Sequence, residues 1–392
     1  MPFFGSLLAL TFMKKKIIRV STVPCSLDSF LEGFLKRLSE DYEVIALSSP
    51  EPELEKVGMR EGVRTIAVPM ERHISLFKDI VSLFRLIYVF AKEHPDMVHS
   101  MTPKAGLLSM LAAWLTRVPV RIHTFTGLVF PIATGLKRKI LMCMDGLTCA
   151  CSTYVNPESK GVANDLKRFG ITKKPLHIIA NGNVRGVDMS YYARTPEVME
   201  KANELRDDKF ITFCFVGRIV GDKGINELIS AFDRLSKNHS NTRLFLVGPR
   251  EHELDPLTDT SESILAENKH ICLFGMQSDI RPYLAASDYF VFPSYREGMP
   301  NVVLEAGAMG LPSIVTNING SNEIIIDGEN GVIIPVKDEE ALHQTMTRWV
   351  EHREEPQKMA DKARRMIEDR YEQQMIWKAT LDEYHCLLED LK

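Results

Sequence analysis

Short apolar runs alternate with longer segments of helical period along nearly the whole chain. This alternation is typical of βαβ units, in which helices join parallel strands and cover both faces of one sheet. In the first half we expect strands at 16–20, 42–48, 65–68, 97–100, 120–124, 146–151 and 176–180, and helices at 30–39, 76–93 and 105–116. The first half therefore predicts a Rossmann-like, doubly wound parallel sheet.

The same alternation begins again after a polar interval at 188–208. In this second series we expect strands at 210–216, 242–247, 271–274, 289–293, 313–316 and 331–334, and helices at 226–236, 281–286, 301–308 and 339–350. We therefore predict an α/β protein with two Rossmann-like doubly wound parallel-sheet domains that face each other across a cleft. Ligands of such sheets bind at the carboxyl ends of the strands.

Domain boundaries follow from the two series. We expect domains at 14–190 and 209–356, a linker at 191–208, and helices at 357–392 that pack back toward the first domain. Residues 1–13 lack a basic region ahead of their apolar core and a small-residue cleavage pattern. We interpret them as a disordered extension or a mis-assigned start rather than a signal peptide. They are also shorter than the ~18 residues that a membrane-spanning helix needs.

The distribution of charge along the chain indicates which classes of partner the protein could bind. Among residues 1–200, Lys and Arg outnumber Asp and Glu by 7, and in the remainder they fall short by 11. A basic first half fits an anionic partner such as a membrane surface or a phosphorylated acceptor, and the alternative is two solvated faces of opposite sign. No nucleic-acid-binding signature accompanies the basic residues, so nucleic acid is not an expected partner.

The seven cysteines are neither dense nor regularly spaced, which indicates a cytoplasmic protein. Cys149 and Cys151 stand in the apolar run 146–151, where no second pair of ligands lies nearby in the sequence. We interpret them as small buried strand residues rather than as a metal or redox pair. No metal ligand set and no cofactor motif is predicted.

A glycine-rich turn with two cations follows the expected strand 210–216. It reads Gly217-Arg218-Ile219-Val220-Gly221-Asp222-Lys223-Gly224 and leads into a helix. Glycines let a backbone approach a ligand closely, and positive charges beside a helix N-terminus favour a diphosphate. The spacing matches neither the Walker pattern nor the dinucleotide fingerprint. An ordinary strand-to-helix turn with surface charges is the alternative.

A second candidate site follows the expected strand 289–293. It reads Ser294-Tyr295-Arg296-Glu297-Gly298-Met299-Pro300-Asn301-Val302-Val303-Leu304-Glu305-Ala306. The backbone N–H groups at the start of a helix point toward whatever lies over its terminus, except at Pro300, which has none. Glu297 precedes the helix and Glu305 lies about one turn inside it, so both side chains are candidates for one ligand. A simple complement of the helix dipole is the alternative for either glutamate.

Together these two motifs resemble the donor site of the retaining glycosyltransferase family 4, which has the GT-B fold. The similarity spans residues 14 to about 380. Further segments resemble the capsular and lipid-linked-oligosaccharide branch of that family, namely 22–27, 99–106, 123–127 and 181–188. The first loop departs from the family, because 23–28 has no glycine pair. The resemblance implies an N-terminal domain on the acceptor side and a C-terminal nucleotide-sugar-binding domain.

The resemblance also implies roles for matching residues. Arg218 and Lys223 would neutralise the diphosphate of the donor and take the place of a metal, and no Asp-x-Asp motif occurs in the chain. Glu305 would accept hydrogen bonds from the ribose, and Glu297 and His123 would contact the transferred sugar. The remaining donor-side candidates are Gly217, Gly298, Met299, Pro300, Asn301, Val302 and, in a loop that would read the base, Met276.

The acceptor side is less defined. Ser26 and Asp28 in the first loop and Lys104 after Pro103 are candidates, although Lys104 also fits an ordinary surface lysine. Basic and apolar residues occur together at 72–90 and near 137–139. They favour contact with the inner surface of the cell membrane, and a helix packed on its own sheet is the alternative.

The implied reaction is the transfer of a hexosyl unit, with retention, from a nucleotide diphosphate sugar, expected to be a UDP-sugar. The acceptor would be polyprenyl-linked or a growing surface polysaccharide, as in capsule or exopolysaccharide biosynthesis. A UDP-sugar 2-epimerase of the same fold and a non-catalytic nucleotide-sugar-binding protein are the alternatives. A nicotinamide dehydrogenase is disfavoured because its glycine fingerprint is missing.

Overall fold

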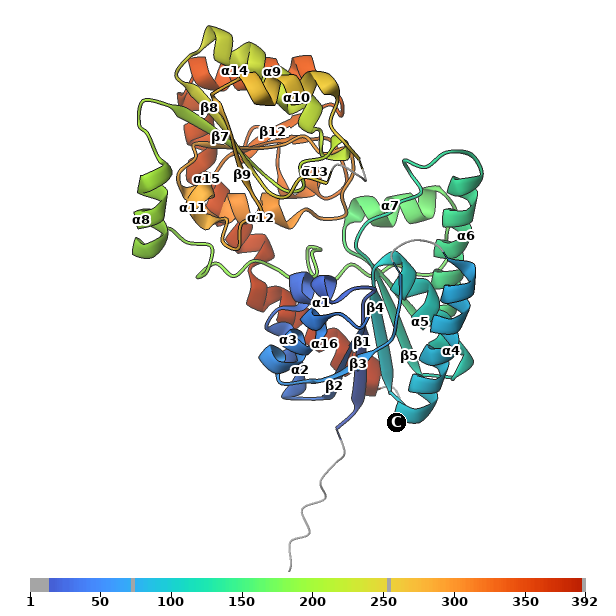
Figure 1. Ribbon diagram of the computed structural model, residues 1–392. Coiled ribbons are helices and arrows are strands. Elements are labelled where there is room, and N and C mark those ends of the chain that lie inside the picture. Colours follow the sequence, from blue (N-terminus) through green and yellow to red (C-terminus); the bar gives the residue numbers. More distant parts are fainter. Residues whose placement is uncertain (1–13, 72–74, 252–254, 390–392) are drawn as a thin grey trace, which may run out of the picture. The chain divides into compact units, whose positions relative to one another are not determined.

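The computed structural model describes residues 14–71, 75–251 and 255–389, which contain two six-stranded sheets (Figure 1). The first sheet has the order β3-β2-β1-β4-β5-β6 and the second has the order β12-β11-β10-β7-β8-β9. The strands of the first sheet are β1 Lys16–Val20, β2 Glu43–Ser48, β3 Arg64–Ala67, β4 Met97–Met101, β5 Val120–Phe125 and β6 Tyr154–Pro157. Those of the second are β7 Ile211–Val216, β8 Thr242–Val247, β9 Ile271–Gly275, β10 Tyr289–Phe292, β11 Ser313–Thr316 and β12 Gly331–Ile334.

Helices connect the strands in both series. The first series contains α1 Pro24–Leu31, α2 Phe34–Ser39, α3 Pro52–Glu61, α4 Leu76–Glu93, α5 Pro103–Leu115, α6 Gly135–Cys151 and α7 Lys160–Arg168. The second contains α8 Pro196–Leu205, the 3-10 turn η1 Gly221–Lys223, α9 Ile225–Asn238, α10 Asp259–Glu267, α11 Arg281–Ala285, α12 Asn301–Ala308, α13 Ser321–Ile324 and α14 Glu339–Glu351. The chain then continues through α15 Glu354–Tyr371 and α16 Gln373–Glu389. The predicted pair of Rossmann-like, doubly wound sheets is thereby confirmed.

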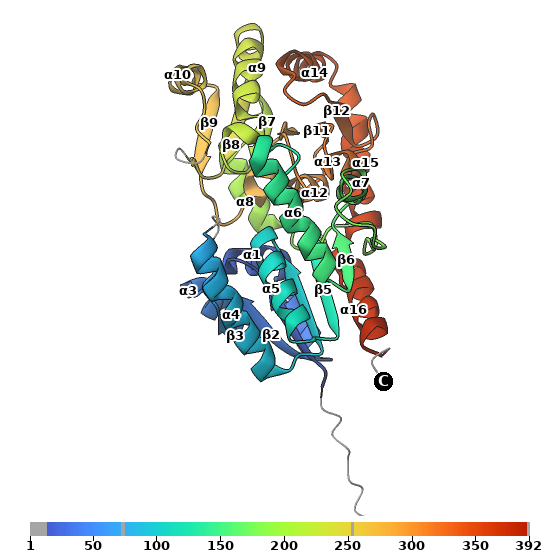
Figure 2. The same ribbon diagram turned by 90° about the vertical axis from the view of Figure 1, so that its right-hand side faces the viewer.

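Burial explains why the strands read as apolar runs. All six residues of β7 are buried, as expected for a parallel strand that helices cover on both faces. Beside the second sheet α9 packs against α14, and beside the first sheet α4 packs against α5. Figures 1 and 2 show both pairs of helices side by side.

The described residues form two compact units. Unit 1 takes residues through Thr124, Met142–Val155 and the end of the chain from Leu381, and unit 2 takes Phe125–Leu141 and Asn156–Thr380. The interval 191–208, which we predict to be a linker, contains α8, whose Val198 and Ala202 are buried in the core of unit 2. The predicted domain boundaries stay predictions.

Three predicted elements differ from the structure. The expected strand 146–151 is the end of helix α6, so Cys149 and Cys151 are buried helical residues, and the strand follows at β6. A run of six small apolar residues shows no periodicity that separates a buried helix from a buried strand. No strand forms at 176–180. The expected helix 30–39 is two helices, because Gly33 is left-handed at φ +75° and breaks it.

A buried polar network ties the last helix to the first sheet within unit 1. Arg19 on β1 is 1% exposed, and its Nη1 donates to the Tyr384 hydroxyl on α16 at 2.6 Å. The same hydroxyl bonds to Nδ1 of His99, and Nε2 of His99 lies 2.7 Å from Oγ1 of Thr124. Burial raises the pKa of Tyr384 to about 12. The network gives partners to Nη1 of Arg19, to the Tyr384 hydroxyl and to both ring nitrogens of His99, whereas Nε and Nη2 of Arg19 are buried with no hydrogen-bond partner among the described residues.

None of the helices in the described part of the chain combines the length and the apolar character needed to cross a bilayer.

Candidate functional site

The loops that follow β7 and β10 meet in unit 2. The two strands are hydrogen-bonded neighbours, so their carboxyl ends lie at the same edge of the sheet. Gly224 has φ +71°, and a Cβ there would lie 2.1 Å from the carbonyl oxygen of Pro293. The amide of Tyr295 donates to the carbonyl of Asp222 at 2.9 Å. Glycine at 224 is therefore required for the two loops to approach this closely.

Lys223 and Glu297, both predicted site residues, are in direct contact at this edge. The Lys223 ammonium bonds to Oε1 of Glu297, and the Ser294 hydroxyl donates to the same oxygen at 2.8 Å. Their side chains are only 16% and 17% exposed, so their attraction is screened less than at the surface. Lys223 also lies 5.6 Å from the centre of the Phe292 ring. A buried, oriented cation thus stands at the ends of two central strands.

Arg218, the other predicted cation, lies at the start of the same loop. Its Nη1 donates to Oε2 of Glu251 at 2.8 Å, and its side chain is 40% exposed. Burial lowers the pKa of the guanidinium, but the hydrogen bond and charge of Glu251 outweigh that effect and raise it overall. Both predicted cations are therefore held by carboxylates, with which an anionic ligand would compete.

The Glu-Gly-Met-Pro loop is packed on both sides. A Cβ on Gly298 would lie 2.3 Å from the carbonyl oxygen of Thr126, and one on Gly320 would lie 2.7 Å from Cα of Met299. The loop leads through Pro300 directly into α12. Its backbone is therefore fixed, with the amides of Asn301 and Val302 in the first turn of α12, where intrahelical acceptors are missing.

Asn183 and Arg185 hold the start of α12. Asn183 Nδ2 donates to Oδ1 of Asn301 at 2.7 Å, and Nη2 of Arg185 bonds to Oε1 of Glu305. Glu305 is 5% exposed and is thus a buried carboxylate with a buried cation as its partner. Burial raises the pKa of the Tyr192 hydroxyl, and the charge of Glu305 beside it adds to the increase.

Two predicted donor-side residues, Gly217 and Met276, and the glycine Gly248 follow three adjacent strands. Gly217 comes after β7, Gly248 after β8 and Met276 after β9. A Cβ on Gly248 would lie 1.9 Å from the carbonyl oxygen of Gly217, and the Gly248 amide donates to the Gly275 carbonyl at 2.8 Å. Met276 is 76% exposed. These loops and the loop after β10 lie at the carboxyl ends of four neighbouring strands of the second sheet.

His123 belongs to unit 1, at the end of β5. It is 1% exposed, and its Nδ1 lies 2.8 Å from the Ser100 hydroxyl. Burial lowers the pKa of His123 to about 3, so the ring is neutral at physiological pH. The predicted contact of His123 with the sugar stays a prediction.

The acceptor-side candidates also belong to unit 1. Ser26 and Asp28 stand on helix α1 rather than in a loop, and Asp28 pairs with Arg60. Lys104 is 7% exposed and donates to Asp79 at 2.7 Å, so it is not the ordinary surface lysine of the alternative.

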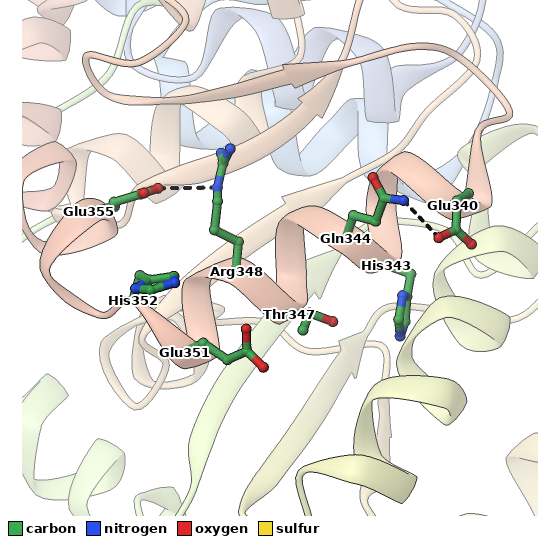
Figure 3. A pocket seen from close by; sticks show the side chains of 8 residues that line it. All are labelled: Glu340, His343, Gln344, Thr347, Arg348, Glu351, His352 and Glu355. Atoms are coloured by element: carbon green, nitrogen blue, oxygen red, sulfur yellow. Dashed lines mark hydrogen bonds and ion pairs between the residues drawn. The ribbon is translucent and has the colours of Figure 1, made fainter.

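A pocket of about 390 Å³ lies on one face of α14, remote in sequence from these loops (Figure 3). Its lining is Glu340, His343, Gln344, Thr347, Arg348, Glu351, His352 and Glu355. None of these is a predicted site residue, and Arg348, its one Lys or Arg, is paired with Glu355 at 3.1 Å. The pocket therefore offers no free cation for a diphosphate.

Sequence reasoning missed three residues beside the site. Arg185 stands in the segment 181–188 that resembles the family, but a lone arginine gives no sign of its partner. Glu158 follows β6, is 4% exposed, and receives only a 3.4 Å hydrogen bond from the Val184 amide. Burial raises the pKa of Glu158 to about 8, and the charge of Glu297 adds to this. Ser294 opens the second candidate motif, but nothing in the sequence indicates that its hydroxyl donates to Glu297.

Both halves of the chain match families of known proteins. Residues 33–182 match the glycosyl transferase 4-like domain, and residues 198–366 match the glycosyl transferases of group 1. No group of three or more His, Cys, Asp or Glu side chains suited to a metal ion is found among the residues with described positions.

Two relatives and one solved structure extend this match. The capsular polysaccharide biosynthesis glycosyltransferase CapM of Staphylococcus aureus is 29% identical over 383 residues, which cover 96% of this chain and 98% of CapM. The UDP-Gal:alpha-D-GlcNAc-diphosphoundecaprenol alpha-1,3-galactosyltransferase of Escherichia coli is 31% identical over 301 residues, 74% of this chain and 75% of that enzyme. Anabaena HepE, in a crystal with UDP and glucose, has a TM-score of 0.80 at 14% identity, covering 95% of this chain and all of HepE (100%).

Proposed function

Because this chain belongs to the GT-B glycosyltransferases, in the capsular and lipid-linked oligosaccharide branch, we propose that it transfers a hexosyl unit from a UDP-sugar with retention of the anomeric configuration. The proposed acceptor is a polyprenyl-linked or growing surface polysaccharide. The Escherichia coli relative is named for a UDP-galactose donor and a diphosphoundecaprenol acceptor, and the HepE crystal contains UDP. These names support the donor and the acceptor class proposed here.

The single observation that carries the donor proposal is the placement of Lys223. Its ammonium is mostly buried at the carboxyl ends of β7 and β10, beside Glu297 and on the same loop as Arg218. Two cations at the strand ends of a doubly wound sheet suit a diphosphate. In the proposed complex both cations turn part of their hydrogen bonding from Glu297 and Glu251 to the phosphate oxygens.

In the proposed reaction the bond between the anomeric carbon and the β-phosphate oxygen breaks, and the acceptor hydroxyl oxygen bonds to that carbon. The hydroxyl proton passes to a phosphate oxygen of the leaving UDP. Negative charge grows on the diphosphate as it leaves, so Arg218 and Lys223 stabilise the transition state more than the ground state. Glu297 holds the hydroxyls of the sugar, and the backbone N–H groups of Met299, Asn301 and Val302 contact sugar and phosphate.

Glu305 and His123 complete the proposed set. Glu305 accepts hydrogen bonds from the ribose hydroxyls, for which a buried carboxylate on a fixed helix is suited. His123, with a pKa lowered to about 3 by burial, is a neutral hydrogen-bonding group and suits an uncharged sugar. Met276 and Gly217 contribute backbone and side-chain contacts on the base side.

We also propose that unit 1 contacts the inner face of the cell membrane through α4. Its inner face buries Leu86 and Phe90, whereas its outer face exposes a second apolar stripe. The stripe consists of Leu76, Phe77, Ile80, Val81, Phe84 and Tyr88. A groove of about 500 Å³ runs beside it, lined by 67–69, Val81, Phe84, Tyr88, Val89 and the exposed Arg85. Exposed aromatic residues next to a cation favour an anionic lipid surface.

The donor proposal is tested by calorimetric titration of the full chain with UDP, GDP and ADP. We expect selective binding of UDP, and its loss in the Arg218→Ala/Lys223→Ala variant. Lys237→Ala, which removes an exposed lysine paired with Asp233 on α9, is the matched control and should bind normally. Failure of the full chain to bind UDP, or equal binding by the double variant, would overturn the proposal.

The reaction is then tested by incubating the enzyme with UDP-hexoses, with and without a polyprenyl-diphosphate-linked acceptor. Product that forms only with acceptor supports transfer, and NMR coupling at the new linkage reports the anomeric configuration. Conversion of the UDP-sugar without acceptor would instead indicate an epimerase.

A further inference from the structure

The Glu305 carboxylate already has a hydrogen-bonding partner in the structure, the Arg185 guanidinium. Its Oε1 accepts a hydrogen bond from Nη2 of Arg185, and the Arg185 and Glu305 side chains are only 16% and 6% exposed. A buried carboxylate without a partner would be costly, and it would repel the phosphates of a nucleotide. Arg185 neutralises it and leaves Oε2 as the second acceptor of the carboxylate.

The backbone around Arg185 is held on both sides. Asn183 Oδ1 accepts from the amides of Arg185 at 3.0 Å and Gly186 at 2.7 Å, while its Nδ2 donates to Asn301. Gly186 has φ +69°, and a Cβ there would lie 2.6 Å from Cα of Gln373. The turn therefore cannot shift freely, and the guanidinium meets α12 at a fixed point.

The two contacts with α12 are one helical turn apart. Asn183 binds Asn301, and Arg185 binds Glu305, four residues further along the same face of the helix. Tyr192 adds a further support, since the guanidinium of Arg185 lies 6.0 Å from the centre of its ring and its hydroxyl lies close enough to Glu305 for the charge of that carboxylate to raise the pKa of the hydroxyl. Arg185, with Tyr192 beside it, thus defines the orientation of the Glu305 carboxylate, while Asn183 fixes the start of the helix that carries it.

We propose that Arg185 is a positioning residue for the nucleotide: it fixes the Glu305 carboxylate, together with Tyr192, so that this carboxylate reads the two hydroxyls of the ribose. The inference rests on the proposed function, because it assumes a ribonucleotide over α12. It assigns to Arg185 the discrimination of a ribose diol from a sugar that lacks it. Arg185 itself does not contact the reacting atoms.

The test compares the dissociation constants of UDP and 2′,3′-dideoxy-UDP by calorimetry. For the wild-type chain we expect UDP to bind at least about 10-fold more tightly, because charged hydrogen bonds to both hydroxyls are lost in the analogue. In Arg185→Met, UDP affinity should fall about 10-fold, while dideoxy-UDP affinity stays within about 2-fold. Glu305→Gln should reduce the discrimination in the same way.

Matched variants distinguish a positioning role of Arg185 from a general effect on the stability of unit 2. Arg281→Met removes another arginine of unit 2 that is 19% exposed and paired with Asp279, and it should leave both affinities unchanged. Arg185→Lys keeps the charge without the planar fork and should also lower the discrimination. Tyr192→Phe, which keeps the ring, provides a further variant in case Arg185→Met fails to fold.

The outcomes are distinct. Equal loss of both nucleotides in Arg185→Met and Arg185→Lys would show a purely structural role and overturn the inference. Unchanged discrimination in those variants would overturn it as well, while leaving the donor site in place. A wild-type chain that binds both nucleotides equally would remove the ribose role of Glu305, whereas one that binds neither would overturn the proposed function itself.

Discussion

The imidazole of His123 occupies the space that a side chain at Gly106 would need. A Cβ on Gly106 would come within 2.2 Å of Cε1 of His123, and the ring is held from its other side by the Ser100 hydroxyl at 2.8 Å. His123 lies on β5 and Gly106 lies in the first turn of α5. The histidine ring can keep this orientation because residue 106 has no side chain.

Gly106→Ala should therefore displace His123. We expect a loss of about 1–3 kcal/mol in the free energy of unfolding, as for other overpacked cores, and reduced turnover. Urea denaturation and the rate of sugar transfer check this. In His123→Ala the ring is gone, so adding Gly106→Ala should cost much less than in the wild type. Additive losses in this double-mutant cycle would contradict the packing argument.

Lys223→Ala should lower kcat by about 10²–10³-fold, because it removes a charge that stabilises the leaving diphosphate. The variant also leaves the mostly buried Glu297 carboxylate with only Ser294 as a described partner. Steady-state kinetics with the UDP-sugar measure the effect, and Lys237→Ala is the control. Near-normal turnover would remove Lys223 from the site. If the loss came only from the unpaired carboxylate, Lys223→Ala/Glu297→Gln would recover most of the activity.

Glu158 should make the stability of unit 2 depend on pH. Burial raises its pKa from 4.5 to about 8, so its contribution is fully present below about pH 4.5 and is lost as pH rises toward 8. The full loss is on the order of 5 kcal/mol, since one pKa unit corresponds to about 1.4 kcal/mol. Glu158→Gln, which cannot ionise, should flatten the decline between pH 5 and 8. Urea titrations followed through Trp349, buried in the core of unit 2, measure it.

Glu93→Gln, in unit 1, is the contrasting variant, and its unfolding is followed through Trp114 on α5 of the same unit. A hydrogen bond from Arg64 holds the pKa of Glu93 down, at about 2, so its contribution is lost only as pH falls below about 4.5. It should leave the slope between pH 5 and 8 unchanged. If Glu158→Gln also left the slope unchanged, the assignment of a neutral Glu158 at pH 7 would be wrong.

The outer stripe of α4 should bind lipid. Replacing Phe77 and Phe84, which are 79% and 66% exposed, by Ser should lower the partition onto anionic vesicles about 10-fold per residue. The fold should be unaffected, since neither side chain is in the core. Sedimentation with phosphatidylglycerol vesicles measures the partition, and neutral vesicles report the electrostatic part. Equal sedimentation of variant and wild type would refute a role of α4.

Periodicity alone predicted much of the fold. The helix expected at 76–93 is found as α4 Leu76–Glu93, because its apolar positions recur at the helical period. The strand predicted at 146–151 was wrong because that apolar run is too short to show a helical or a strand period. Likewise α8 lies in a polar stretch whose two buried residues, Val198 and Ala202, are too few to indicate a helix.

For the site, the sequence indicated which loops carry glycines and charged residues, but it did not indicate which side chains contact one another. Glycines and charges after expected strands pointed to Lys223 and Glu297, whose direct contact joins residues 74 positions apart. Arg185 and Glu305 are 120 positions apart, and only the folded chain shows that one holds the other. Two residues so far apart in the chain do not form a sequence motif, so the sequence alone does not indicate their contact.

The buried bond between Arg19 and Tyr384 also constrains the order in which the protein can be completed on the ribosome. Every strand of the first sheet has been synthesised by residue 157, yet the partner of Arg19 and His99 emerges only with the last helix. At elongation rates of ~5–20 residues per second this delay is on the order of tens of seconds. During it Nη1 of Arg19 and Nδ1 of His99 in the nascent first sheet lack the hydroxyl that they share, and a chain truncated before residue 384 would lack it permanently.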